Sequence, residues 1–479
     1  MQRSLVGSEM CIRDSNVSGL ADAAVRESYD RIVPAIYHSG LTYPKQRITI
    51  NLAPADIKKE GSGFDLPITI GILTAGQLID VPDLGDYMMA GELSLDGSLL
   101  PVKGALPMAV MARAKGFRRL IVPEGNVTEA AVVNKLEVFG ARNLRDVVSI
   151  MTGKGDIQPT RIDTRAIFAQ SANRFDCDFS EVKGQESVKR ALEVACAGGH
   201  NLLMVGPPGA GKSMMAKRIP SILPPLGMAE ALETTKIHSV AGKLRRGDML
   251  MTERPFRSPH HTVSPIALVG GGVNPMPGEI SLAHNGVLFL DEFPEFPRTV
   301  LEVLRQPIED RVITVSRAKY TVQYPANFML VASMNPCPCG YYGHPTRPCT
   351  CAPGAVARYM NRISGPLLDR IDIHVEIEPV AFDAMASDQP AESSEAIRQR
   401  VVEARLLQAE RFKDEPGIYC NAQMNSRLIH RHAWPDAEGM ARLKSRMEKL
   451  DMSARAFDRI LRVARTIADL DLSLIHISE

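Results

Sequence analysis

Hydrophobic and polar positions follow different patterns along the chain, and the first pattern covers residues 16–155. A helical period at residues 20–27 is mixed there with short β-rich runs at residues 47–52 and 119–123. Glycine-rich turns separate these runs, which is typical of an α+β domain. The polar stretch 156–174 contains a proline and has no clear period, so we expect a linker there.

The second pattern, at residues 175–385, alternates apolar runs with helical segments. The apolar runs at residues 201–205, 286–290 and 327–333 are rich in Leu, Val and Phe. Continuous apolar strands between helices predict a parallel α/β sheet. Residues 393–471 have helical periodicity only, so we expect a helical domain there. The whole chain is therefore predicted to be a multidomain α/β protein.

The two ends of the chain match neither pattern. The first fifteen residues, MQRSLVGSEMCIRDS, have no apolar core of a signal peptide and no strand or helix period. The last residues, LSLIHISE, interrupt a helical pattern that is still running. Both strings resemble translated sequencing-adapter sequence, so we expect residues 1–15 and 472–479 to be non-native. A native extension is the alternative.

Composition narrows the class of protein. The chain has 479 residues, 56 Lys and Arg against 55 Asp and Glu, and 45% hydrophobic residues, which predicts about three globular domains. A net charge of +1 gives no overall basic field, so any DNA binding must use local patches. The apolar stretch 66–79 is too short to cross about 30 Å of hydrocarbon, so we expect no membrane association.

The strongest local signal is a glycine-rich loop that fits G-x-x-x-x-G-K-[ST], directly after an apolar strand and before a helical stretch. The loop consists of Gly206, Pro207, Pro208, Gly209, Ala210, Gly211, Lys212 and Ser213. In such a loop the backbone N–H groups close around phosphate oxygens at a helix N-terminus. Lys212 is then expected to bind the β- and γ-phosphates of ATP, and Ser213 to ligate Mg²⁺.

Two further strands end in polar residues suited to the same chemistry. The run 286–290 is followed by Asp291 and Glu292, which places Asp291 at the carboxyl edge of the sheet beside the Mg²⁺. Glu292 is expected to polarise the attacking water as a general base. Asn335 follows the next strand and is expected to contact the γ-phosphate or that water.

Four of the eight cysteines lie close together in the sequence. Cys337, Cys339, Cys349 and Cys351 form two C-x-C pairs. Four thiolates at this spacing can close a tetrahedral structural zinc site in a reducing, cytoplasmic compartment. Reduced structural or redox-active cysteines are the alternative.

At this point the chain resembles known families. Three segments resemble the magnesium-chelatase-like branch of AAA+ ATPases: FRSPHHTVS (256–264), PGEISLAHNG (277–286) and SGPLLDRID (364–372). The first block resembles the Lon-protease-type, ribosomal-S5-like domain through NLAPAD (51–56), KEGSGFDLP (59–67) and GELSLDG (91–97). This domain order resembles that of the bacterial YifB/ComM family.

The resemblance implies a hexameric ring ATPase that acts on single-stranded and branched DNA, as a helicase or branch-migration motor in natural transformation. It implies that Arg370 is the arginine finger, with Arg362 as the nearby competitor. Arg455 would be the second-sensor arginine of a helical lid. A magnesium-chelatase-like or chaperone-like ATPase that remodels a partner protein is the alternative.

Two other expectations follow from the resemblance. Residues 311–324 read as a β-hairpin with a basic tip, where Arg317 and Lys319 would follow a DNA backbone in the ring pore. A solvated turn is the alternative. In the first domain, Ser62 is out of register with a Lon-type nucleophile and Leu106 stands where its lysine is expected. We therefore expect a scaffold and not a peptidase.

Overall fold

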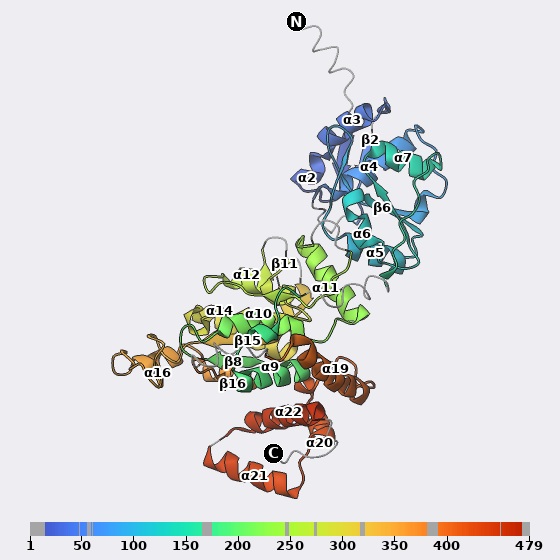
Figure 1. Cartoon of the computed structure of the whole chain (residues 1–479). Coiled ribbons are helices and arrows are strands. Elements are labelled where there is room, and N and C mark those ends of the chain that lie inside the picture. The colour runs from blue at the N-terminus through green and yellow to red at the C-terminus, as the bar shows by residue number, and fades with distance from the viewer. Residues whose placement is uncertain are drawn as a thin grey trace. The chain divides into compact units, whose positions relative to one another are not determined.

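The computed structural model describes residues 15–46, 48–54, 59, 61–164, 175–244, 249–272, 275–316, 321–380, 391–450 and 452–471. The chain divides into two compact units, whose elements are labelled in Figure 1. Unit 1 contains residues 1–169 and 238–251, and unit 2 contains residues 170–237 and 252–479. Residues 238–251 therefore group with the first block, although they lie inside the second block in sequence.

Unit 1 is a mixed α/β domain. Its three-stranded parallel sheet has the order β3 (Tyr87–Met89), β6 (Arg119–Pro123), β7 (Glu137–Ala141). A parallel pair joins β1 (Ser15–Ser18) to β2 (Ile48–Asn51), and an antiparallel pair joins β4 (Glu92–Leu93) to β5 (Leu99–Leu100). The helices are α2 (Ala23–Arg26), α3 (Ser28–His38), α4 (Asp65–Ala75), α5 (Ala105–Ala114), α6 (Val127–Ala130) and α7 (Leu144–Thr152). Strands thus form within both predicted β-rich runs.

Unit 2 is built on a five-stranded sheet in which every pairing is parallel. The spatial order is β16 (Ile373–Glu376), β8 (Leu202–Val205), β15 (Met329–Met334), β12 (Val287–Leu290), β9 (Phe256–Arg257). This confirms the predicted parallel α/β sheet. The fourth strand along the chain, β15, lies between the first, β8, and the third, β12, so the carboxyl ends of these three strands are neighbours.

Helices cover both faces of this sheet. Successive strand residues point to opposite sides, and the side chains on each side pack against a different set of helices. Leu202 and Met204 pack with the helices α9 (Glu186–Gly198), α10 (Lys212–Ile222) and α19 (Ser394–Arg411). Leu203 packs on the other face with α12 (Pro265–Val269), α13 (Glu279–Leu282), α14 (Arg298–Val303) and α17 (Gly365–Leu368). The three central strands, β8, β15 and β12, are buried on both faces, which explains their continuous apolar runs.

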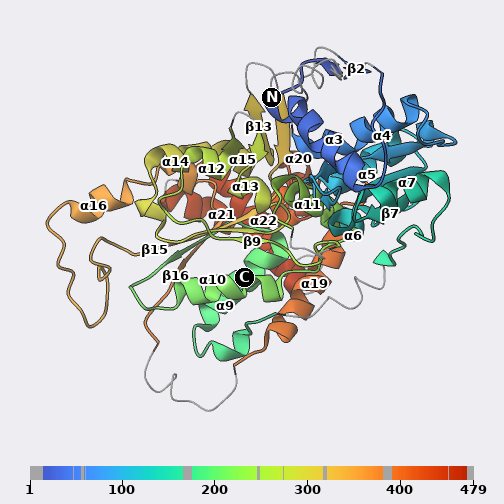
Figure 2. The same cartoon turned by 90° about the horizontal axis from the view of Figure 1, so that it is seen from above.

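Two small antiparallel pairs extend from the sheet connections. One joins β10 (Gly270–Gly271) to β11 (Met276–Pro277). The other joins β13 (Val312–Ser316), which follows α15 (Arg305–Asp310), to β14 (Thr321–Pro325). Figure 2 shows β13 and its partner strand standing out beside α15. The remaining helices of this part are α11 (Met228–Ala241), which runs across the unit boundary at residue 238, and α16 (Ala355–Met360).

The C-terminal block is helical, as the periodicity predicts. It contains α19, α20 (Ser426–His432), α21 (Ala437–Lys449) and α22 (Ala454–Leu470) (Figure 1). Ser393 and Ser453 cap α19 and α22 by accepting a backbone N–H in the first turn, which sets where these helices begin. A buried carboxylate, Asp469, joins α22 to Arg411 at the end of α19.

Candidate nucleotide-binding site

The glycine-rich loop occupies the turn between β8 and α10. Gly209 and Gly211 have φ of +80° and +89°, a region that residues with a Cβ rarely adopt. A Cβ on Gly206 would lie 2.6 Å from the carbonyl oxygen of Ile377, so only glycine fits at this position. The three glycines therefore set the path that brings the chain from the strand into the helix that begins at Lys212.

Lys212 folds back over the loop that precedes it. Its Nζ donates to the carbonyl oxygens of Gly206 at 2.7 Å and Pro207 at 2.9 Å, and to Asn335 Oδ1 at 3.0 Å. Burial lowers the pKa of Lys212, while the negative charge of Asp291 opposes this shift. The ammonium is thus held by oxygen acceptors at the end of the sheet, where phosphate oxygens can take their place.

Asp291 gathers two hydroxyl groups from neighbouring elements. Ser213 Oγ donates to Asp291 Oδ2 at 2.6 Å, and Ser333 Oγ donates to Asp291 Oδ1. Hydroxyl and carboxylate oxygens are the ligands that Mg²⁺ prefers, so Ser213 and Asp291 fit this ion. The sequence pattern did not indicate Ser333 as a site residue. Its position two residues before Asn335 was a usable signal, because residues i and i+2 of a strand share a face.

Glu292 has an unusual backbone conformation and a histidine partner. Its φ of +54° lies in the left-handed region, which costs about 1–2 kcal/mol for a residue with a Cβ. Its side chain is exposed, and Oε2 lies 3.2 Å from Nδ1 of His261, whose ring lies 4.0 Å from that of His260. Strain of this kind is common where a side chain is held for chemistry. The sequence did not predict the contact with His261.

The candidate arginines Arg370 and Arg455 lie near each other, away from the glycine-rich loop of the same chain. Arg370 is only 11% exposed, and its Nη2 lies 2.6 Å from Glu309 Oε1. Arg370 and Arg455 both line a cavity of about 410 Å³ that none of the residues 206–213 lines. The competitor, Arg362, is 52% exposed and pairs with Glu295. The low exposure of Arg370 and its place in this cavity distinguish it from Arg362.

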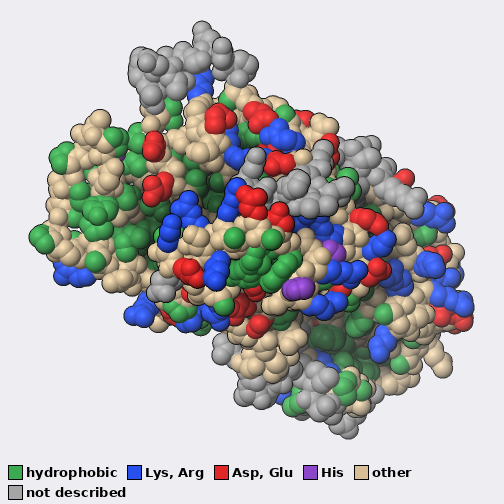
Figure 3. All heavy atoms as spheres, turned by 90° about the horizontal axis from the view of Figure 1, so that it is seen from below, with side chains coloured by type: hydrophobic (Ala, Val, Ile, Leu, Met, Phe, Trp, Pro, Cys, Tyr) green, Lys and Arg blue, Asp and Glu red, His purple; other side chains and the backbone are tan. Residues whose placement is uncertain are grey.

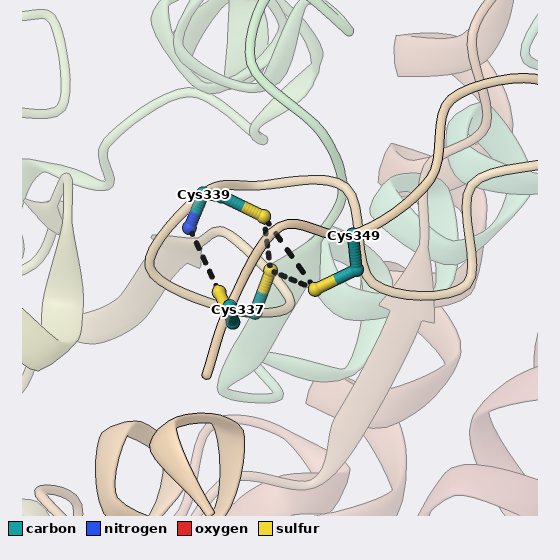
Figure 4. A group of neighbouring side chains, drawn as sticks. Cys337, Cys339 and Cys349 are labelled. Atoms are coloured by element: carbon teal, nitrogen blue, oxygen red, sulfur yellow. Dashed lines mark hydrogen bonds between the residues drawn. The ribbon is translucent and has the colours of Figure 1, made fainter. Parts of the chain in front are cut away.

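The four clustered cysteines meet in space after β15. Their sulfur atoms all lie within 4.8 Å of one another. Figure 4 shows the sulfur atoms of Cys337, Cys339 and Cys349 pointing toward one another. The distances are 3.3 Å from Cys337 to Cys339, 3.5 Å from Cys339 to Cys349 and 3.7 Å from Cys337 to Cys349. The tertiary structure therefore joins both C-x-C pairs into one group.

The predicted basic hairpin is present as β13 and β14, with Ser316 opposite Thr321. Its tip, with Arg317 and Lys319, lies outside the described residues. On the face drawn in Figure 3, Lys and Arg side chains are interspersed with Asp and Glu, and no single basic patch covers it. This distribution agrees with the near-neutral composition.

Most of the chain matches known protein families. Residues 178–385 match the family described as "Magnesium chelatase, subunit ChlI", residues 8–126 match "Subunit ChlI of Mg-chelatase", and residues 391–475 match "Magnesium chelatase, subunit ChlI C-terminal". The chain is 44% identical to "Uncharacterized protein YifB" of Escherichia coli, over 95% of this chain and 87% of that protein. It is 42% identical to "Competence protein ComM" of Haemophilus influenzae, over 94% of this chain and 87% of that protein.

The chain belongs to the YifB/ComM family of magnesium-chelatase-like proteins. Together with the parallel sheet and its glycine-rich loop, membership of this family identifies an ATPase of the magnesium-chelatase-like AAA+ class. Within the described residues, every helix is too short or too polar to cross a bilayer.

Parts of this YifB/ComM family member are also similar to proteins outside the family. It is 26% identical over 106 residues to "Archaeal Lon protease" of Methanocaldococcus jannaschii, which covers 22% of this chain and 16% of that protein. It is 28% identical over 114 residues to "DNA repair protein RadA" of Haemophilus influenzae, which covers 24% of each. The likeness to Lon protease is therefore partial.

Ser62 of this family member has a carboxylate partner. Its Oγ donates to Glu92 Oε2, and a carboxylate cannot supply the lysine amine that a Ser/Lys dyad requires. Leu106, at the position where a Lon-type lysine is expected, is fully buried in the core of unit 1. The contact of Ser62 with Glu92 and the burial of Leu106 both favour the prediction that this domain is a scaffold.

Proposed function

We propose that this protein is an ATP-hydrolysing motor that assembles as a hexameric ring in the cytoplasm and acts on DNA. The observation that carries the ATPase part is the meeting of three strand ends. Lys212 and Ser213 follow β8, Asp291 follows β12 and Asn335 follows β15, and hydrogen bonds join them in pairs. Residues from distant parts of the sequence thus form one phosphate- and metal-binding edge.

Each residue has a role in this proposal. Lys212 binds the β- and γ-phosphates within the loop 206–213, and Asn335 orients the γ-phosphate or the attacking water. Ser213 and Asp291 hold Mg²⁺, which neutralises negative charge on the phosphate oxygens when it is bound. Glu292 accepts a proton from the water as general base.

Arg370 acts, in this proposal, as the arginine finger on ATP bound by a neighbouring subunit, and Arg455 is the second-sensor arginine of the helical lid. The support for action between subunits is that Arg370 lines a cavity which the loop 206–213 of the same chain does not line. The test mixes two inactive variants, Lys212→Ala and Arg370→Ala, because a mixed ring contains interfaces where both intact residues meet. We expect ATPase activity to return on mixing. Activity that stays at the level of the separate variants would contradict action between subunits.

DNA is the proposed substrate of the motor, through the β13–β14 hairpin. A relative named a competence protein supports this part, and branch migration or unwinding that promotes integration of incoming DNA is the activity that we propose. A basic tip that follows phosphates without reading bases suits a translocating motor. Exchange of Arg317 and Lys319 for Ala should bring the ratio of ATPase rates with and without DNA to about one.

Remodelling of a partner protein is the second candidate, because all three family matches carry the name of magnesium chelatase. The deciding experiment measures ATPase activity of the full chain alone, with single-stranded DNA, with branched DNA and with unfolded protein. Stimulation by DNA supports the first proposal. Stimulation by unfolded protein alone would replace it with the second.

A further inference from the structure

We propose that Cys337, Cys339, Cys349 and Cys351 bind one zinc ion, and that the closed loop braces the nucleotide-binding loop. The metal site stands on its own geometry. The bracing role rests on the proposed function, because it assigns phosphate binding to residues 206–213.

The arrangement of the sulfur atoms matches tetrahedral zinc. Sulfurs at about 2.3 Å from a common zinc lie about 3.8 Å from one another. The three separations between the sulfurs of Cys337, Cys339 and Cys349 are 3.3 to 3.7 Å, close to that value. These separations are far longer than a disulfide bond of about 2.05 Å. The four sulfurs are therefore placed as ligands of one ion and not as bonded pairs.

Backbone N–H groups also point at the sulfurs. The amide of Tyr342 donates to Cys337 Sγ at 3.3 Å, and the amide of Cys339 donates to Cys351 Sγ at 3.4 Å. Such donors stabilise negative charge on thiolates, the form in which cysteine binds a metal. The group offers sulfur ligands only, and a set of four sulfurs selects zinc or iron over Mg²⁺. Zinc suits a structural loop because it is redox-inactive.

The loop needs such a crosslink. Between the end of β15 at Met334 and the start of α16 at Ala355, the chain forms no helix or strand. Loops of more than about 12–15 residues without secondary structure are uncommon in compact domains. A metal bound by residues near both of its ends closes the loop and removes most of its conformational freedom.

The closed loop contacts the nucleotide-binding loop at two points. Asn335, two residues before Cys337, accepts a hydrogen bond from Lys212. Gly340, next to Cys339, packs on Pro208 so closely that a Cβ on Gly340 would lie 2.4 Å from Pro208 Cδ. A metal bound between these points fixes both contacts, and so fixes the loop that cradles the phosphates.

The first experiment measures metal in the purified full chain by elemental analysis and by the absorption of a cobalt-substituted sample. We expect about one zinc per chain and the bands of tetrahedral cobalt–thiolate coordination. Cys349→Ser should lose the metal, whereas Cys177→Ser, a cysteine outside the group, should keep it. Absence of metal from the wild-type chain would overturn the site, and bound iron would overturn the choice of zinc.

The second experiment tests the brace with two glycines of the same loop. Gly340 and Gly343 have φ of +85° and +77°, but a Cβ on Gly343 would meet nothing within 4 Å. Both Ala variants therefore carry similar backbone strain, and only Gly340→Ala presses on Pro208. We expect Gly340→Ala to bind a fluorescent ATP analogue about tenfold more weakly than Gly343→Ala, because small misplacements of a binding loop are costly.

Further measurements separate the zinc site, the bracing role and the proposed ATPase activity from one another. Removal of zinc from the wild-type chain should also weaken binding of the analogue, which avoids reliance on a variant that folds poorly. Equal affinities of both glycine variants, or unchanged affinity after zinc removal, would overturn the brace. A chain that binds zinc and the analogue but does not hydrolyse ATP would contradict the proposed ATPase and leave the zinc site standing.

Discussion

Asp469 should be the most sensitive charged position in the C-terminal helical block. Its side chain is fully buried, and it accepts hydrogen bonds from Arg411 at 2.7 Å, from Arg465 at 2.7 Å and from Asn421 at 2.8 Å. Asp469→Asn keeps the size of the side chain but leaves two buried guanidinium groups without a countercharge. Breaking one partner out of a buried ion pair costs about 3–5 kcal/mol. The same helix, α22, carries Arg455 in its first turn.

The assay uses Trp434, the only tryptophan of the chain. Its ring lies 4.5 Å from that of His430 and 6.0 Å from that of Phe457 on α22, so its fluorescence reports unfolding of this block. With a urea dependence of about 2 kcal/mol per M, the expected loss lowers the midpoint by roughly 1.5–2.5 M. Glu438→Gln, which removes an exposed pair with Arg442, is the control and should leave the midpoint unchanged.

Ionisation of Asp469 should also make the stability of the C-terminal helical block depend on pH. Burial by itself raises the pKa of Asp469, but hydrogen bonds and charge from Arg411, with Asn421 and Arg465, outweigh burial and hold the pKa below its ordinary value. The stabilisation is therefore complete above the unfolded-state pKa of about 3.9 and is lost as the pH falls through the lower folded-state value. If the urea midpoint of Asp469→Asn equals that of Glu438→Gln at neutral pH, the predicted loss of stability is wrong.

Three other variants test the site and unit 1. Glu292→Gln should lower kcat about 10²- to 10⁴-fold with ATP affinity retained, and an unchanged kcat would exclude Glu292 as general base. Gly206→Ala should weaken equilibrium binding of ATP, because its Cβ would meet the carbonyl oxygen of Ile377 at 2.6 Å; wild-type affinity would contradict this close approach. The chain should not degrade casein, because Ser62 faces Glu92, and casein degradation that Ser62→Ala abolishes would show a peptidase.

Local features of the site were readable without a structure. Gly209 and Gly211 are required by the local backbone conformation of the loop 206–213, so the glycine spacing predicts the turn, whereas the close approach of Gly206 to Ile377 is a tertiary contact. The strands β8, β12 and β15 were visible as apolar runs because both faces of a parallel sheet are buried. The polar residues at their ends, Asp291 and Asn335, were therefore placed at one edge of the sheet in advance.

The pairings between these residues depended on the sheet order. Because β15 lies between β8 and β12, Ser333 reaches Asp291 and Asn335 reaches Lys212. No local pattern specifies which strand is the neighbour of which, so these contacts could not be assigned from spacing. The contact of His261 with Glu292 has the same origin.

The sequence by itself therefore determined the family, the nucleotide-binding loop and the identity of the candidate ligands, because these follow from residue types at short separations. Tertiary structure alone decided the partner of Arg370, the grouping of residues 238–251 with unit 1, and the contact of the cysteine loop with Pro208. The physical reason is the distance along the chain over which each kind of interaction acts. Backbone preferences and side-chain chemistry act over a few residues, whereas contacts between distant segments depend on how strands and helices pack around shared cores.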